Sequence, residues 1–212
     1  MTIDINSVGM EKGQQYETII TTVNKEGIKN AAPIGVIARG NDEVMCRIFN
    51  TSTTLKNIIN QKEFVINILT NPLMFTLSTI DNIPLEYFKD EKNIAILNNN
   101  DAYLKCVVTD LKEATKKNDP VRKTTPATII KAKVVEMKIN SPCPKAINRG
   151  IHLLIESLVN YTRIDIVDNE KQDYYLGRLK EAQRVIRKVG SKEEKEAIKI
   201  LKESLKNKGY KI

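Results

Sequence analysis

The sequence lacks a long hydrophobic run. Its longest unbroken apolar stretch, Ala31 to Ala38, is far shorter than the roughly 18 residues that suggest a membrane-spanning helix. Asp4 and Glu11 lie where a signal peptide would carry first a basic and then an apolar segment. We therefore expect a cytoplasmic protein that makes no contact with a membrane. With 212 residues, 41% hydrophobic and 28% charged, the composition is typical of a globular chain of one or two domains.

Cysteine and histidine are also scarce. Cys46, Cys106 and Cys143 are widely spaced and form no Cys-x-x-Cys pair of the kind used by zinc and redox sites, so we expect reduced thiols and no metal. His152 is the only histidine, and it falls inside a helical pattern without a nucleophile signature beside it. The short motifs of zinc peptidases, P-loop enzymes and Rossmann dehydrogenases are missing. These classes of enzyme are thus disfavoured.

Basic residues outnumber acidic ones, 34 to 26, for a net charge of +8. Most of the excess lies after residue 140, where 16 basic residues accompany 10 acidic ones. A basic tail suggests a nucleic-acid-binding module, but its lysines alternate with glutamates over 192–208, as on the solvated face of a helix. The four tyrosines of the tail are too scattered to form a base-stacking platform. Nucleic-acid binding therefore ranks last among the functions considered.

Up to residue 140 the sequence predicts strands joined by short connections. Segments rich in β-branched and aromatic residues are expected to form strands over 16–24, 30–39, 43–49, 63–69, 102–111 and 127–138. Tight turns at 24–27 and 40–42 favour antiparallel pairing of neighbouring strands, as in a meander or barrel. The polar segment 116–123 is expected to be a surface loop.

After residues 141–144 the hydrophobic period changes to that of helices. Apolar residues recur every three or four positions between Ile147 and Val159, and a second helix is expected over 173–189. A capping-box pattern opens a third helix at Ser191. The sequence thus predicts an α+β protein with a strand-rich domain over 1–140 and a C-terminal helical subdomain over 141–212. The last two helices are expected to form a hairpin.

The most informative segment is 47–57, where a strand ends and a helix begins. Four consecutive hydroxyl side chains meet the free N–H groups of a helix N-terminus here: Thr51, Ser52, Thr53 and Thr54. Such a terminus suits a phosphate. Arg47 shares a strand face with Phe49 and can give phosphate oxygens a forked, charge-assisted contact. The same hydroxyl residues also fit a simple helix cap, which is their more common use.

A second segment of interest is a strand of small residues that contains a proline. It comprises Asn30, Ala31, Ala32, Pro33, Ile34 and Gly35. Small side chains let a flat ring approach the backbone closely. Pro33 has no N–H to place in a ladder, so it marks an edge or bulge where backbone groups can face a ligand. Alternatively, small residues suit the crowded interior of a barrel.

Taken in order, these segments resemble the FMN-binding split barrels of the flavin-reductase-like type. The similar pattern runs from Thr21-Thr22 through Gly27, residues 30–36, Arg47-Ile48-Phe49 and the Ser/Thr cluster to residues 63–68. With Asn71-Pro72, Asn148-Arg149-Gly150, residues 156–159 and Thr162-Arg163, the chain more narrowly resembles an archaeal branch of these barrels, one of undefined physiological role. The fold implied is an antiparallel split β-barrel with short crossing helices.

The resemblance also implies a cofactor, FMN, and its site. The phosphate site of the family falls on Arg47 and residues 51–54, beside Phe49, and the backbone of residues 30–35 offers contacts to the isoalloxazine edge. Family members are homodimers with FMN at the subunit interface. Residues of the second subunit are therefore implied to complete the site, with Arg149, His152 and Arg163 as candidates.

Two functions share these features. The first is an FMN-dependent oxidoreductase in which the flavin exchanges a hydride with a small-molecule donor or acceptor. The second is an FMN carrier or sensor that binds the cofactor without turning over. Reduction by NADH, NADPH or another donor would separate them.

Overall fold

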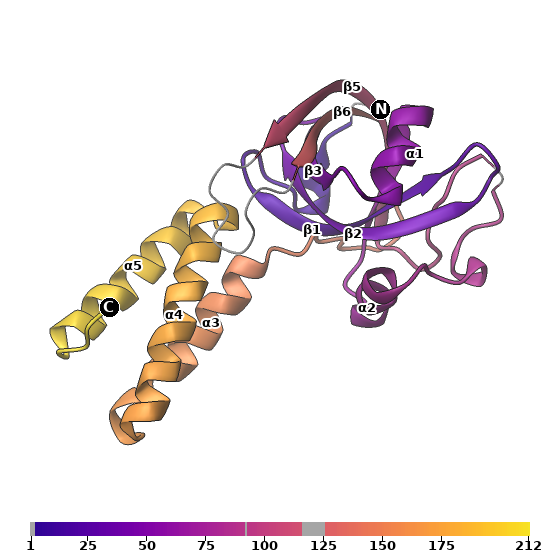
Figure 1. The fold of residues 1–212 in the computed structure, drawn as a ribbon. Coiled ribbons are helices and arrows are strands. Elements are labelled where there is room, and N and C mark those ends of the chain that lie inside the picture. The colour runs from indigo at the N-terminus through magenta and orange to yellow at the C-terminus, as the bar shows by residue number, and fades with distance from the viewer. Residues whose placement is uncertain (1–2, 92, 116–125) are drawn as a thin grey trace. The chain divides into compact units, whose positions relative to one another are not determined.

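A computed structural model describes residues 3–91, 93–115 and 126–212 (Figure 1). The chain divides into two compact units, one ending at Ile147 and one covering Asn148–Ile212. The division falls after Ile147 rather than after residue 140 because the intervening segment bonds back to the first unit. The Glu17 N–H donates to the Ile147 carbonyl at 2.8 Å, and the Ala146 N–H donates to the Val8 carbonyl at 3.0 Å.

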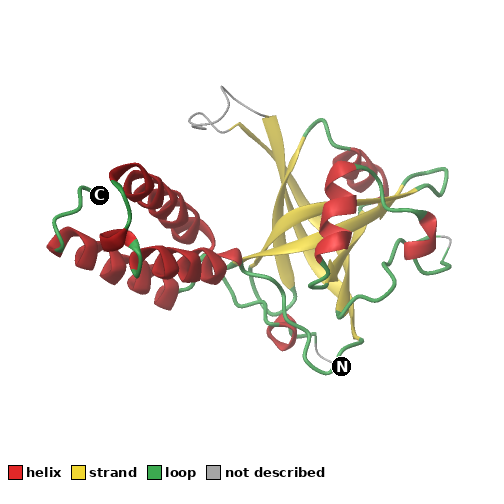
Figure 2. Ribbon diagram, turned by 90° about the horizontal axis from the view of Figure 1, so that it is seen from below, coloured by secondary structure: helices red, strands yellow, loops and turns green. Residues whose placement is uncertain are grey.

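The first unit is built on a β-barrel (Figure 2). Its strands are antiparallel and form a closed barrel in the order β1-β2-β3-β6-β5-β4. The strands are β1 (Gln15–Val23), β2 (Lys29–Ala38), β3 (Glu43–Phe49), β4 (Glu63–Ile68), β5 (Ala102–Thr115) and β6 (Pro126–Ile139). The predicted strands are confirmed, although β5 continues to Thr115 instead of ending at residue 111. The loop expected over 116–123 lies outside the described residues.

Successive side chains along each strand point alternately into the barrel and out of it, so the sequence of a strand determines which side chains lie outside. In β3, Val44, Cys46 and Ile48 are buried in the barrel core, whereas Arg47 and Phe49 are exposed. Because side chains of a strand point alternately to opposite faces, Arg47 and Phe49 share the outer surface. The predicted common face of these two residues is therefore present.

Short helices cross the barrel. Helix α1 (Thr53–Gln61) buries Leu55 and Ile58 against it, and α2 (Pro72–Ile80) lies beside β2 (Figure 1). The 3-10 turns η1 (Ile5–Val8) and η2 (Leu85–Tyr87) complete the unit. The α+β split barrel predicted from the sequence is the observed fold.

The second unit consists of α3 (Arg149–Tyr161), α4 (Asn169–Val189) and α5 (Lys192–Asn207), with the 3-10 turn η3 (Ile164–Ile166). Their shared core includes Leu154, Leu179, Ile186 and Leu201. The predicted capping box of α5 is present, since Ser191 Oγ accepts from the Glu194 N–H. Helix α4 begins four residues earlier than residue 173. No helix in the described ranges is long and apolar enough to cross a membrane.

Candidate functional site

The barrel is closed, but β2 and β3 pair with each other over only part of their length, and we call the place where they are unpaired the split. The two strands pair only over Val36–Ala38 of β2 and residues 44–46 of β3. The earlier part of β2, residues 29–35, pairs with β1 on its other side. The later part of β3, residues 47–49, pairs with β6. Within the described residues, β2 therefore presents a backbone edge that no strand covers.

Specific backbone groups face this split. The Ile34 carbonyl accepts from a β1 side chain, and Ala38 bonds to Gly13 and Gln14 on the same side. Because successive residues of a strand direct their N–H and C=O groups to opposite sides, Ala31, Pro33 and Gly35 direct theirs toward the split. We call this stretch, 31–35, the open edge of β2.

Gly35 is closely covered. A Cβ atom placed there would collide with the Gln15 side chain. The side chains of Ala32, Pro33 and Ile34 are half-buried. The open edge is thus lined by small or compact groups, and the Gln15 side chain covers Gly35.

The Ser/Thr cluster at the start of α1 divides into different roles. Ser52 is the N-cap, and its Oγ accepts from the Leu55 N–H at 3.1 Å. Thr51 and Thr53 are exposed. The capping role proposed for the cluster therefore applies to Ser52, while two hydroxyl groups stay accessible at the helix terminus.

Thr54 ties the helix to β2. Its side chain is buried, and its Oγ1 accepts from Asn30 Nδ2 at 3.1 Å. This bond brings the N-terminus of α1 beside the start of β2. The N–H groups of Thr53 and Thr54 belong to the first helical turn, where the helix itself offers them no acceptor.

Arg47 and Phe49 lie on the outer surface of the strand that leads into this helix. The Arg47 guanidinium carbon is 6.0 Å from the centroid of the Phe49 ring, and Phe49 is 51% exposed. The turn is fixed by the Ser52 N–H, which donates to the Phe49 carbonyl at 3.1 Å. It is fixed also by Thr128, whose Oγ1 donates to Asn50 Oδ1 at 2.9 Å. These two hydrogen bonds hold the turn that joins Arg47 and Phe49 on β3 to the exposed hydroxyl groups at the start of α1.

The structure places the twelve predicted cofactor residues on three connected elements: the β2 edge, the end of β3 and the start of α1. Of these residues, Ala31 and Thr54 have buried side chains, and the others are half-buried or exposed. The three residues considered for the second subunit, Arg149, His152 and Arg163, are exposed residues of the C-terminal unit.

Sequence reasoning missed Asn82, which follows α2. Asn82 Oδ1 accepts from the Ala31 N–H at 3.1 Å, and Nδ2 donates to the Lys29 carbonyl at 2.8 Å. These contacts join residues more than 50 positions apart in the sequence. No local pattern marks such a contact, so only the fold discloses it.

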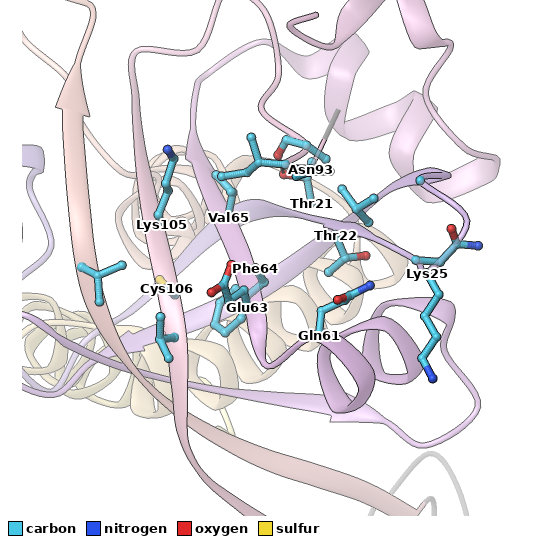
Figure 3. A pocket seen from close by; sticks show the side chains of 17 residues that line it. Thr21, Thr22, Lys25, Gln61, Glu63, Phe64, Val65, Asn93, Lys105 and Cys106 are labelled. Carbon is cyan, nitrogen blue, oxygen red and sulfur yellow. Dashed lines mark hydrogen bonds between the residues drawn. The ribbon is translucent and has the colours of Figure 1, made fainter. Parts of the chain in front are cut away.

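A hollow of about 570 Å³ opens elsewhere, between the β1–β2 hairpin, the end of α1, β4 and β5 (Figure 3). None of the predicted cofactor residues lines it. Thr21 donates to the Ala95 carbonyl there, and Lys105 pairs with Glu136 at 2.8 Å. Burial raises the pKa of Cys106 well above its usual value, so this thiol stays protonated. The hollow therefore offers a weaker candidate than the split.

Comparison with known protein families shows to which family the chain belongs. The model described as the N-terminal domain of the protein of unknown function DUF447 matches residues 16–141. A second model, described as the protein of unknown function DUF447, matches residues 148–203. The chain belongs to the DUF447 family. The gap between the two DUF447 models contains the division between the two structural units.

Solved structures similar to this chain include one from the same family. The chain is similar to the FMN-bound DUF447 protein MM1853 from Methanosarcina mazei, with 25% identity, a TM-score of 0.54, and coverage of 94% of this chain and 99% of that one. It is also similar to the styrene monooxygenase flavin reductase from Pseudomonas putida S12, with 12% identity, a TM-score of 0.49, and coverage of 65% and 89%.

Proposed function

We propose that this DUF447 protein binds FMN at the split of the barrel. The observation that carries the proposal is the open edge of β2 beside the N-terminus of α1, joined by the Asn30–Thr54 hydrogen bond. The edge offers a planar ring backbone partners, and the helix terminus offers a phosphate N–H donors. The FMN-bound relative MM1853, which matches nearly the whole chain, supports the same cofactor.

The residues at the helix terminus fit a phosphate. The first-turn N–H groups of Thr53 and Thr54 carry the positive end of the helix dipole. The exposed hydroxyl groups of Thr51 and Thr53 add short neutral donors. Arg47 supplies a full positive charge and a forked donor on the adjoining strand. These donors match a phosphate dianion, which carries several acceptor oxygens.

The open edge of β2 fits the polar side of an isoalloxazine ring. The carbonyl groups of Ala31, Pro33 and Gly35 accept hydrogen bonds, and the Gly35 N–H donates one. The exposed ring of Phe49 gives an apolar surface on the facing strand. A flavin carries both an imide N–H and carbonyl oxygens, which complement such an edge.

We infer that the protein is an FMN-dependent oxidoreductase of the flavin-reductase-like kind, with a small-molecule electron donor or acceptor. Bound FMN supplies the hydride chemistry, so the chain needs to bind the flavin, orient it and polarise its ring. A backbone N–H donor beside the ring stabilises negative charge there. The alternative within the same site is an FMN carrier or sensor.

We further propose a homodimer with FMN at the subunit interface. Arg149, His152 and Arg163 are accessible for contact with another copy, and each offers a polar group to an anionic cofactor. In this arrangement the barrel of one subunit holds the phosphate while the helical unit of its partner covers the ligand.

The first experiment is the visible absorption spectrum of the purified protein, with any heat-released ligand identified by chromatography and the apo-protein titrated with FMN. Stoichiometric FMN supports the site. Anaerobic addition of NADH or NADPH then distinguishes the two roles, since bleaching with turnover indicates a reductase, whereas bound flavin that no donor reduces indicates a carrier or sensor. A colourless protein that ignores added FMN contradicts the proposal.

A further inference from the structure

Asn82 occupies the beginning of the uncovered side of β2. Its Nδ2 donates to the Lys29 carbonyl at 2.8 Å, and its Oδ1 accepts from the Ala31 N–H at 3.1 Å. A carboxamide that bonds the carbonyl of one residue and the N–H of the residue two positions later does what a paired strand would do there. Asn82 therefore closes the edge at Lys29 and at the Ala31 N–H, and leaves the rest open.

The carboxamide is held firmly. The Asn82 N–H donates to Asp81 Oδ1 at 2.7 Å, and Asn82 Oδ1 accepts a second bond from the Ile83 N–H at 3.1 Å. Ile83 is 2% exposed and belongs to the same apolar cluster as Ala31. Packing and hydrogen bonding thus fix Asn82 against β2.

This arrangement leaves an asymmetric row of groups along the open edge. The Ala31 N–H is taken by Asn82, and Pro33 has no N–H. Of the residues whose backbone groups face the split over 31–35, only Gly35 still offers an N–H, whereas Ala31, Pro33 and Gly35 all offer carbonyl groups. A ring that needs both a donor and an acceptor from the edge must therefore place its acceptor at Gly35.

We propose that Asn82 is a positioning residue that confines the flavin ring to one register on the open edge of β2. This inference rests on the proposed FMN site. Asn82 acts by removing the Ala31 N–H, which would otherwise be a second donor and would allow a second register four residues away. The ring class selected is one with an imide, in which an N–H stands between carbonyl oxygens.

Asn98 provides a matched control. It belongs to the same connection between α2 and β5, and its Nδ2 also donates to backbone carbonyls, of Glu86 at 2.9 Å and Phe88 at 3.2 Å. Removing its side chain loosens the same connection without touching β2. A general effect of a loosened segment would appear in both variants.

The test titrates the apo forms of the full-length wild type, Asn82→Ala, Asn82→Asp and Asn98→Ala with FMN and with riboflavin, following flavin fluorescence and the visible spectrum. We expect Asn82→Ala to bind both flavins no more weakly than the wild type, because the freed Ala31 N–H adds a second register without removing the first register or the phosphate contacts. We also expect broader flavin absorption bands, from two ring registers. Asn82→Asp keeps the acceptor for the Ala31 N–H and should retain the narrow bands, and Asn98→Ala should match the wild type.

Several results would overturn the inference while leaving the FMN site intact. They are an unchanged spectrum in Asn82→Ala, weaker binding of either flavin by that variant, or the same broadening of the bands in Asn98→Ala. Circular dichroism melts accompany each titration, and if Asn82→Ala does not fold, broadened bands in Asn82→Asp would count against the inference. A wild type that binds neither flavin refutes the FMN site itself, and the positioning role with it.

Discussion

At the scale of single residues, Arg47 is the side chain whose proposed role is easiest to isolate. It is exposed on the outer face of β3, so its replacement leaves the barrel core unchanged. Charge-assisted hydrogen bonds contribute about 1.5–3 kcal/mol, so Arg47→Ala should weaken FMN binding roughly tenfold to a hundredfold. Riboflavin binding should be unaffected. Isothermal titration with both flavins makes the measurement.

Lys56→Ala is the control for this substitution, because Lys56 is also an exposed cation and lies on α1 beyond its first residues. The same FMN affinity in both variants would remove Arg47 from the phosphate site.

The cysteines give a second prediction at this scale. Burial raises the pKa of Cys46 to about 12, and that of Cys106 well above its usual value, whereas Cys143 is exposed. Because the thiolate is the reactive form, Cys46 and Cys106 should resist alkylation at pH 8 in the folded protein. Mass spectrometry after maleimide treatment should find one label on the native chain and three after denaturation. Rapid labelling of all three in the native state would contradict the buried positions.

At the scale of elements, Asn67 joins strands and a loop. It is fully buried on β4, its Nδ2 donates to the Ile19 carbonyl and to Thr21 Oγ1, and its Oδ1 accepts from the Leu97 N–H at 3.0 Å. Asn67→Ala removes all three bonds and leaves buried polar groups without partners. The free energy of unfolding should fall by about 3 kcal/mol in urea denaturation. Asn60→Ala, at an exposed position of α1, should change it little; equal losses would contradict this role.

The elements also show what the sequence could predict. The strands followed from β-branched segments and tight turns, and the helices from their period and caps, since these signals are local. The position of Asn82 against β2 depends on a contact between segments that are distant in the sequence, so local sequence patterns could not predict it. The different roles of Ser52, Thr53 and Thr54 likewise depend on which side of α1 meets the barrel. The cluster was predictable as a unit, but its division was not.

At the scale of the whole molecule, the shared site proposed for the dimer makes a complementation prediction. One chain carries Arg47→Ala and Thr53→Ala; the other carries Arg149→Ala, His152→Ala and Arg163→Ala. Each alone should bind FMN weakly. A mixed dimer should regain one site of wild-type affinity, because one of its two sites draws intact residues from both chains.

Light scattering establishes the dimer, and flavin titration of the purified mixed dimer gives the number of tight sites. A mixed dimer without a tight site, or a tail variant with normal affinity, would place the whole site within one subunit.

The uncovered side of β2 has a consequence for the protein before it acquires a ligand. Unpaired strand edges are templates for association with other chains, and proteins guard them with prolines, covering segments or short lengths. Here Pro33 interrupts the row of donors and Asn82 covers one end, which leaves few groups available to a foreign strand. The features that suit the split to a flat ring thus also act as safeguards against aggregation in the newly made chain.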